Sequence, residues 1–147
     1  MCIRDSPNTN LKDNDIKKVV ICSGKVFYNL LEERENRKLD SVKILRLEQI
    51  YPFPYSTLKE ILSDTPNAEF VWCQEEPKNM GAWFFVDRKI EDVLRSFKAK
   101  FSRPFYAGRA EAASPATGSL SRHNKEQADL VNEALETTQK TTKHAAE

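Results

Sequence analysis

The feature that most constrains the fold of this chain is a regular alternation of two kinds of segment. Short apolar runs rich in β-branched residues, each of a length that suits a buried strand, are followed by longer stretches whose apolar residues recur at helical spacing. This pair of segments occurs four times between residues 17 and 136. Strands that alternate with helices form a mostly parallel sheet, because right-handed crossovers place helices on both of its faces. The sequence therefore predicts a three-layer α/β fold.

The positions of these runs define the expected elements. We expect strands at 19–21, 42–47, 70–72 and 103–107, and helices at 26–37, 58–62, 82–97 and 121–135. Pro52 and Pro54 predict a rigid elbow after the second strand, because proline lacks the backbone N–H that a strand interior uses. The small residues of 110–118 indicate an ordered crossing loop. Ser121 is the expected N-cap of the last helix.

Charge and cysteine content exclude several classes of protein. The 23 lysines and arginines nearly balance the 22 aspartates and glutamates, so we expect neither nucleic acid nor membrane as a partner. No apolar run is long enough to span a bilayer. The three cysteines have no metal-ligand spacing, which favours a reducing compartment. Cys22 and Cys73 each end an apolar run, and we expect both to be buried thiols.

The two ends of the chain lack apolar periodicity. Residues 1–16 are interpreted as a disordered or non-native lead-in, and residues 137–147 as a disordered tail. We also interpret the first six residues, MCIRDS, as foreign sequence joined to a truncated reading frame. The domain itself is expected to occupy residues 17–136.

A docking loop is expected after the central strand. The chain changes there from apolar to polar residues, and Gly81 ends the loop before the next helix. Ligands and partners of open α/β sheets gather at the carboxyl ends of the strands. The residues that we assign to docking are Gln74, Glu75, Glu76, Pro77, Asn79, Gly81 and Trp83. The exits of the first three strands, at 22–25, 48–51 and 74–77, are expected to meet at one edge of the sheet.

The residues at this edge give little support for catalysis or metal binding. Glu75 and Glu76 are adjacent, so their side chains are expected to point apart rather than to act as an acid–base pair. His123 stands beside no cysteine or carboxylate cluster, which favours a hydrogen bond at a helix start over a metal site. Neither Ser114 nor Ser121 has a base nearby in the sequence. We therefore assign no catalytic residue and no metal ligand.

One turn could hold an anion. Ser23, Gly24 and Lys25 precede a helix, where free backbone N–H groups and the helix dipole favour negative charge. A simple strand-to-helix turn explains the same residues, because the full phosphate-loop pattern is missing. Trp72, Trp83, Phe84 and Phe85 are interpreted as core and interface packing rather than as a cofactor site. The residues alone thus indicate a docking or regulatory domain.

Several segments carry a resemblance to a known family. The chain resembles the C-terminal domain of the thiamine-diphosphate-dependent first component of 2-oxoglutarate dehydrogenase, from about Lys17 to Leu135. The fold that this resemblance implies is transketolase C-terminal-domain-like. QEEPKNMGAW followed by SPATG is specific to that family. The matching segments are CSGKVFYNLLEER, LRLEQIYPFP, VWCQEEPKNMGAWFFV, YAGR, ASPATG and SRHNKEQADLVNEAL.

The resemblance implies a reaction for the intact enzyme. Thiamine diphosphate and magnesium would support decarboxylation of 2-oxoglutarate in the tricarboxylic acid cycle, and the succinyl group would pass to the lipoyl arm of the dihydrolipoyl succinyltransferase component. The implied partners are the upstream thiamine-binding domains, a homodimer mate and that transferase, in a multienzyme complex. The implied location is the bacterial cytoplasm, with the mitochondrial matrix as the other source compatible with the resemblance.

The chain departs from the complete family pattern by what it lacks. It contains neither G-D-G nor the paired asparagines of thiamine enzymes, and the family's substrate histidines lie in earlier domains, so His123 does not take that role. We therefore expect the isolated chain to be inactive and to bind no cofactor. Two alternatives remain open: a stand-alone module of the same fold that binds a nucleotide or a partner, and a small redox protein that would need the sulfurs of Cys22 and Cys73 to be adjacent.

Overall fold

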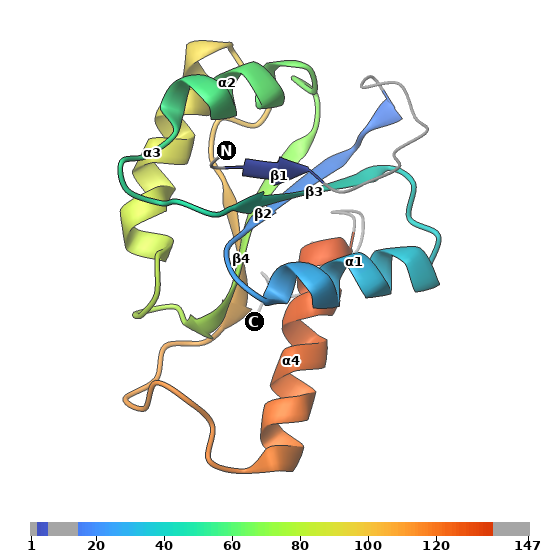
Figure 1. Ribbon diagram of the computed structural model, residues 1–147, viewed down its shortest axis with the longest axis vertical. Helices are drawn as coiled ribbons and strands as arrows, with labels where there is room; N and C mark the ends of the chain where they lie inside the picture. The colour runs from blue at the N-terminus through green and yellow to red at the C-terminus, as the bar shows by residue number, and fades with distance from the viewer. Residues whose placement is uncertain (1–2, 6–14, 137–147) are drawn as a thin grey trace, which may run out of the picture.

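The protein is built around a five-stranded sheet in the order β1-β3-β2-β4-β5 (Figure 1). The computed structural model describes residues 3–5 and 15–136. Four strands are parallel, and β1 joins the edge beside β3 in the antiparallel direction. The strands are β1 (Ile3–Asp5), β2 (Lys18–Cys22), β3 (Val42–Leu47), β4 (Glu69–Pro77) and β5 (Phe105–Arg109). This confirms the predicted mostly parallel sheet.

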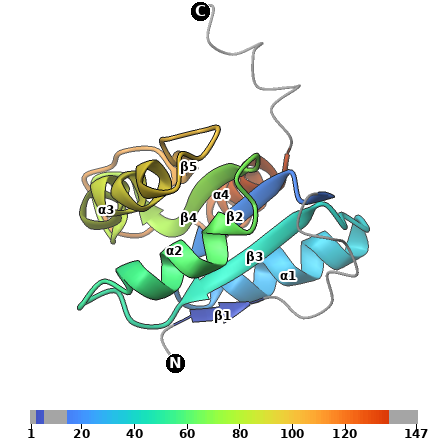
Figure 2. The same cartoon turned by 90° about the horizontal axis from the view of Figure 1, so that it is seen from above.

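Helices cover both faces of the sheet, and a separate core lies under each pair (Figure 2). Alternate residues of β2 point to opposite faces, so Val19 and Ile21 join one core while Val20 and Cys22 join the other. The first face carries α2 (Tyr55–Ser63) and α3 (Trp83–Ser96), and the second carries α1 (Val26–Asn36) and α4 (Leu120–Leu135). The three-layer α/β/α prediction is therefore confirmed.

The prediction of a disordered lead-in is wrong for its described part. Ile3–Asp5 pairs with β3, with Ile3 opposite Leu47, and the Ile3 side chain is buried in the first core. Ile16 is buried in the same core. Three residues are too few to show a periodic pattern, and their order comes from pairing with a distant strand. The rest of 1–14 and the predicted tail at 137–147 lie outside the described residues, and the foreign origin of the first six residues stays a prediction.

Several element bounds differ from the expected ones. β4 continues through Pro77, because beyond Cys73 it has a pairing partner on only one side, where a strand tolerates proline. Four residues that we assigned to a loop therefore lie in a strand: Gln74, Glu75, Glu76 and Pro77. The last helix begins at Leu120 with Ser119 as its N-cap, so Ser121 is not the cap residue. Among the described residues, no helix is long and apolar enough to cross a membrane.

Candidate functional site

The three predicted strand exits meet at the carboxyl edge of the sheet. β2 lies between β3 and β4, and Cys22 is in register with both Arg46 and Cys73. Side chains at this edge also meet, because Lys25 Nζ, in the turn after β2, lies 3.7 Å from Oε1 of Glu75 in β4. Lys25 is mostly exposed, so this ion pair adds little stability. It does place a carboxylate beside the turn that we considered for anion binding.

Gln74 is the internal brace of this edge. Its Oε1 accepts hydrogen bonds from Trp72 Nε1 at 3.0 Å and from the Trp83 backbone N–H at 3.1 Å. Its Nε2 donates to the backbone carbonyl groups of Glu76, Pro77 and Met80, at 3.2, 3.0 and 2.9 Å. The side chain is buried, and without it the Trp72 indole N–H and the Trp83 N–H would lack an acceptor away from water. One amide thus fixes the end of β4, the following turn and the start of α3.

Gly81 closes this turn. Its φ is +67°, in the left-handed region that other residues rarely adopt. A Cβ atom there would lie 3.1 Å from Gln74 Oε1 and 3.1 Å from Glu76 Cβ. Glycine at this position therefore allows the turn to pack closely against the Gln74 side chain. We call residues 74–83 the docking segment from here on.

A second loop lies against the docking segment. Asn79 Nδ2 donates to the Ala112 carbonyl at 3.0 Å, and Asn79 Oδ1 accepts from the Ala112 N–H at 3.1 Å. This reciprocal pair joins the docking segment to the small-residue loop 110–118. On its other side, Thr117 Oγ1 donates to Glu126 Oε2 of α4 at 2.5 Å. The loop is therefore held at both ends, as its predicted ordered character requires.

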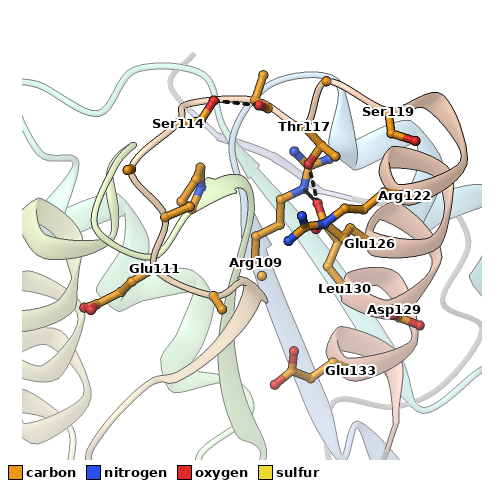
Figure 3. Close-up of a pocket in the computed structure, with 17 residues that line it drawn as sticks. Arg109, Glu111, Ser114, Thr117, Ser119, Arg122, Glu126, Asp129, Leu130 and Glu133 are labelled. Atoms are coloured by element: carbon orange, nitrogen blue, oxygen red, sulfur yellow. Dashed lines mark hydrogen bonds and ion pairs between the residues drawn. The ribbon is translucent and has the colours of Figure 1, made fainter.

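A cavity of about 610 Å³ opens beneath loop 110–118, between the exit of β5 and α4 (Figure 3). Arg109 lies at its centre with a side chain that is 9% exposed, and its Nε is 3.4 Å from Glu126 Oε2. Glu126 also accepts from Arg122 Nε at 2.9 Å. Thr117 and the two arginines together lower the pKa of the Glu126 carboxyl, with the Thr117 hydrogen bond as the largest cause.

The charges around this cavity do not favour an anion. Arg109 and Arg122 are already paired with Glu126, and three further carboxylates line the wall: Glu111, Asp129 and Glu133. Desolvation raises the pKa of the Glu133 carboxyl despite a hydrogen bond from the Gly108 N–H. A diphosphate would therefore face more negative than positive side chains. Within residues 3–5 and 15–136 no three metal-ligating side chains are grouped to hold a metal ion.

The other candidate residues have ordinary structural partners. Glu75 accepts from Gln127 Nε2 at 2.9 Å, while Glu76 is exposed. His123 Nδ1 lies 3.0 Å from Arg109 Nη2, so its side chain contacts the β5 exit and not the helix start that we predicted. Ser114 Oγ donates to the Ala116 carbonyl at 2.9 Å. Ser121 Oγ lies 3.0 Å from Ser119 Oγ.

Cys22 and Cys73 are register neighbours on adjacent strands, as a redox pair would require, but both are free and fully buried. Burial raises the pKa of the Cys22 thiol to about 12 and that of Cys73 well above its ordinary value. Only the thiolate reacts in disulfide exchange. The environment of these thiols therefore suits packing in the core.

Sequence reasoning missed the fourth strand exit. Arg109 ends β5 and organises the cavity, yet we counted only the first three exits. A charged residue directly after the fourth apolar run was the available signal. The pairing of Asn79 with Ala112 had no such signal, because 33 positions separate them.

Comparison with known proteins assigns the chain to a family. The family described as 2-oxoglutarate dehydrogenase C-terminal matches residues 1–135. The 2-oxoglutarate dehydrogenase E1 components of Brucella anthropi, Brucella ovis and Brucella canis are each 56% identical to this chain over 124 residues. The alignment covers 84% of this chain and 12% of each relative, so the chain spans about an eighth of their length. The chain belongs to the 2-oxoglutarate dehydrogenase C-terminal family.

Proposed function

We propose that this chain works as the C-terminal part of a 2-oxoglutarate dehydrogenase E1 polypeptide and that its own task is packing between domains. The partners are the upstream part of the same polypeptide and a homodimer mate. The observation that carries this proposal is the construction of the docking segment. Gln74 braces it from inside, while Glu76, Asn79 and Gly81 are exposed on its outer side. A preformed surface of this kind loses little entropy on association.

The reaction of the intact enzyme is the second part of the proposal. The relatives are named 2-oxoglutarate dehydrogenase E1 component, which is an oxidoreductase. We infer that the full polypeptide decarboxylates 2-oxoglutarate with thiamine diphosphate and magnesium. It would then pass the succinyl group to the dihydrolipoyl succinyltransferase component, within the tricarboxylic acid cycle. A bacterial cytoplasm is the proposed location, in keeping with the bacterial relatives.

The cofactor itself does not fit the residues of this chain. The cavity beneath loop 110–118 carries the carboxylates of Glu111, Asp129 and Glu133, which would repel a diphosphate, and its two arginines are paired with Glu126. We therefore assign thiamine diphosphate and magnesium to the upstream part of the polypeptide. Regulation by an anionic effector at Ser23, Gly24 and Lys25 is a separate proposal, and the Glu75 carboxylate beside Lys25 would oppose such an anion.

The test uses a chimera in which this chain replaces the matching C-terminal segment of the Brucella anthropi relative. We expect three results with 2-oxoglutarate, thiamine diphosphate and magnesium: turnover from the chimera, none from the relative lacking its segment, and none from this chain alone. The assay is carbon dioxide release.

Two outcomes would contradict the proposal. Turnover above the blank by the isolated chain would show that it is a catalyst by itself. A folded but inactive chimera would favour the stand-alone module, for which nucleotide binding to the isolated chain is the direct measurement.

A further inference from the structure

Aromatic side chains lie open on the surface beside the docking segment. Tyr51, in the elbow after β3, is 79% exposed, and Phe85, in the first turn of α3, is 40% exposed. Tyr55, at the start of α2, is as exposed as Phe85. Phe53, which lies between Tyr51 and Tyr55 in the sequence, is half-buried. We call these four residues, Tyr51, Phe53, Tyr55 and Phe85, the aromatic patch.

The patch is an ordered surface. The rings of Tyr51 and Phe85 meet edge to face with centroids 6.3 Å apart. The Lys89 ammonium lies 5.9 Å from the centroid of the Phe53 ring and 5.0 Å from that of Phe85, so one cation joins the elbow to α3. Tyr55 Oη donates to the Asp92 carbonyl at 3.4 Å. The aromatic rings are therefore arranged before any partner arrives.

Grouped exposed aromatic residues of this kind usually belong to an interface. Aromatic residues are enriched at the centres of protein interfaces, and contiguous apolar patches on a surface mark interaction sites. The patch also continues the docking segment, since Phe85 follows Trp83 by two positions in α3. Between them, Phe84 is 63% exposed.

We propose that the aromatic patch is covered by an apolar segment, with an acidic residue facing Lys89, from the polypeptide that precedes this chain in its longer relatives. This inference rests on the proposed function. It adds the aromatic patch, which lies outside the docking segment, to the surface that contacts the rest of the polypeptide.

Two observations favour this occupant. The chain spans only 12% of the relatives' length, so most of their polypeptide lies outside it. The second observation takes residues 1–6 as native sequence, in contrast to the foreign origin considered above: Ile3 pairs with Leu47, the last residue of β3, and β1 runs antiparallel to β3. The start of β1 therefore lies at the carboxyl edge of the sheet, beside the end of β3 (Figure 1), and Phe53 of the elbow packs against the core that contains Ile3. The family match includes these first residues.

The test is hydroxyl-radical footprinting of the isolated 147-residue chain and of the Brucella anthropi chimera. We expect Tyr51 and Phe85 to be oxidised at least fivefold more slowly in the chimera. Tyr28, 58% exposed on α1 at the opposite face, is the matched control and should react equally in both. Met80 reports on the docking segment, and buried Trp72 stays unoxidised as long as the chimera is folded.

The outcomes separate this inference from the proposed function. Protection of Met80 without protection of Tyr51 and Phe85 would overturn the patch inference and leave docking intact. Protection of neither region would overturn both. Protection of Tyr51 in the isolated chain that grows with concentration would identify a second copy as the occupant and overturn the proposal.

A second measurement applies if the chimera does not fold. The isolated chain is titrated with the relative lacking its C-terminal segment, and binding is followed by sedimentation. The double variant Tyr51→Ser, Phe85→Ser should bind at least tenfold more weakly than the unaltered chain, whereas Tyr28→Ser should bind equally. Equal binding by the double variant, or none by the unaltered chain, would contradict the inference.

Discussion

Gly108 has no room for a side chain. A Cβ atom there would lie 2.5 Å from Tyr106 Oη and 2.9 Å from the Gln74 carbonyl oxygen. Gly118, in contrast, has nothing within 4 Å of the same position. These two glycines therefore form a natural pair for comparison, one inside a strand against the docking segment and one in an open loop.

We expect Gly108→Ala to lower the free energy of unfolding by about 1–3 kcal/mol, the usual cost of forcing an extra carbon into a packed site. Gly118→Ala should change it by no more than about 0.5 kcal/mol. Urea denaturation of both variants measures the difference. Equal stability of the two would show that β5 can move away from Gln74 without cost.

The Gln74 side chain makes more hydrogen bonds than any other side chain in the docking segment. In Gln74→Ala the Trp72 indole N–H and the Trp83 backbone N–H lose their acceptor while they stay buried. Because such groups cost about 1–3 kcal/mol each, we expect the two together to lower the free energy of unfolding by about 2–6 kcal/mol.

The control for this substitution is Gln49→Ala, because the exposed Gln49 side chain donates to the Tyr51 carbonyl. We expect it to cost about 0.5 kcal/mol or less. Chemical denaturation gives both values, and a Gln74→Ala protein as stable as Gln49→Ala would contradict the bracing role.

At the scale of elements, loop 110–118 depends on its contact with the docking segment. In Asn79→Ala the Ala112 N–H and carbonyl lose their side-chain partner. We expect amide hydrogen exchange at Ala112 to accelerate about tenfold, while global stability changes by less than about 1 kcal/mol because the contact is exposed. Ser114→Ala, which removes a hydrogen bond inside the loop, should leave Ala112 unchanged. Unaltered exchange in Asn79→Ala would mean that α4 alone holds the loop.

The core elements could be predicted from the sequence because their pattern is local. A strand such as β2, buried on both faces, shows as a continuous apolar run, and α3 shows as a stripe at helical spacing. Features that depend on distant partners left no such pattern. β1 is ordered by its pairing with β3. β4 extends beyond Cys73, where it pairs with β5 but no longer with β2.

The candidate site followed the same rule. The meeting of three strand exits could be predicted, since parallel strands end at one edge. The five hydrogen bonds of Gln74 and the ion pairs of Glu126 could not, because they depend on how side chains turn in space. The docking and effector roles of the assigned residues stay predictions.

For the whole molecule, the buried thiols link stability to pH. The folded protein raises the pKa of Cys22 from 9.0 to about 12 and also raises that of Cys73, so it holds protons that the unfolded chain releases. The stabilisation is complete below pH 9 and is lost as the pH rises towards 12. We expect Cys22 to contribute a fall of about 1.4 kcal/mol per pH unit in that window, and Cys73 to act in the same direction.

The measurement is urea denaturation under reducing conditions at pH 8.5, 9.5 and 10.5. Cys22→Ala should show a shallower fall than the unaltered chain, whereas Ser23→Ala, in the turn directly after β2, should keep the original slope. Parallel slopes in all three proteins would show that Cys22 ionises equally in both states.

The short strand β1 has a consequence for how the molecule behaves among its own copies. It pairs with Leu45–Leu47 at the outer edge of β3, whose backbone groups there would otherwise be free to add a strand from another molecule. Val42, Ile44 and Leu45 make β3 strongly apolar, which is the composition that promotes cross-molecule pairing and fibrils. Removal of residues 1–5 should therefore give a protein that folds but aggregates on standing, visible as light scattering that the intact chain does not develop. We thus expect three residues at one margin of the sheet to limit aggregation.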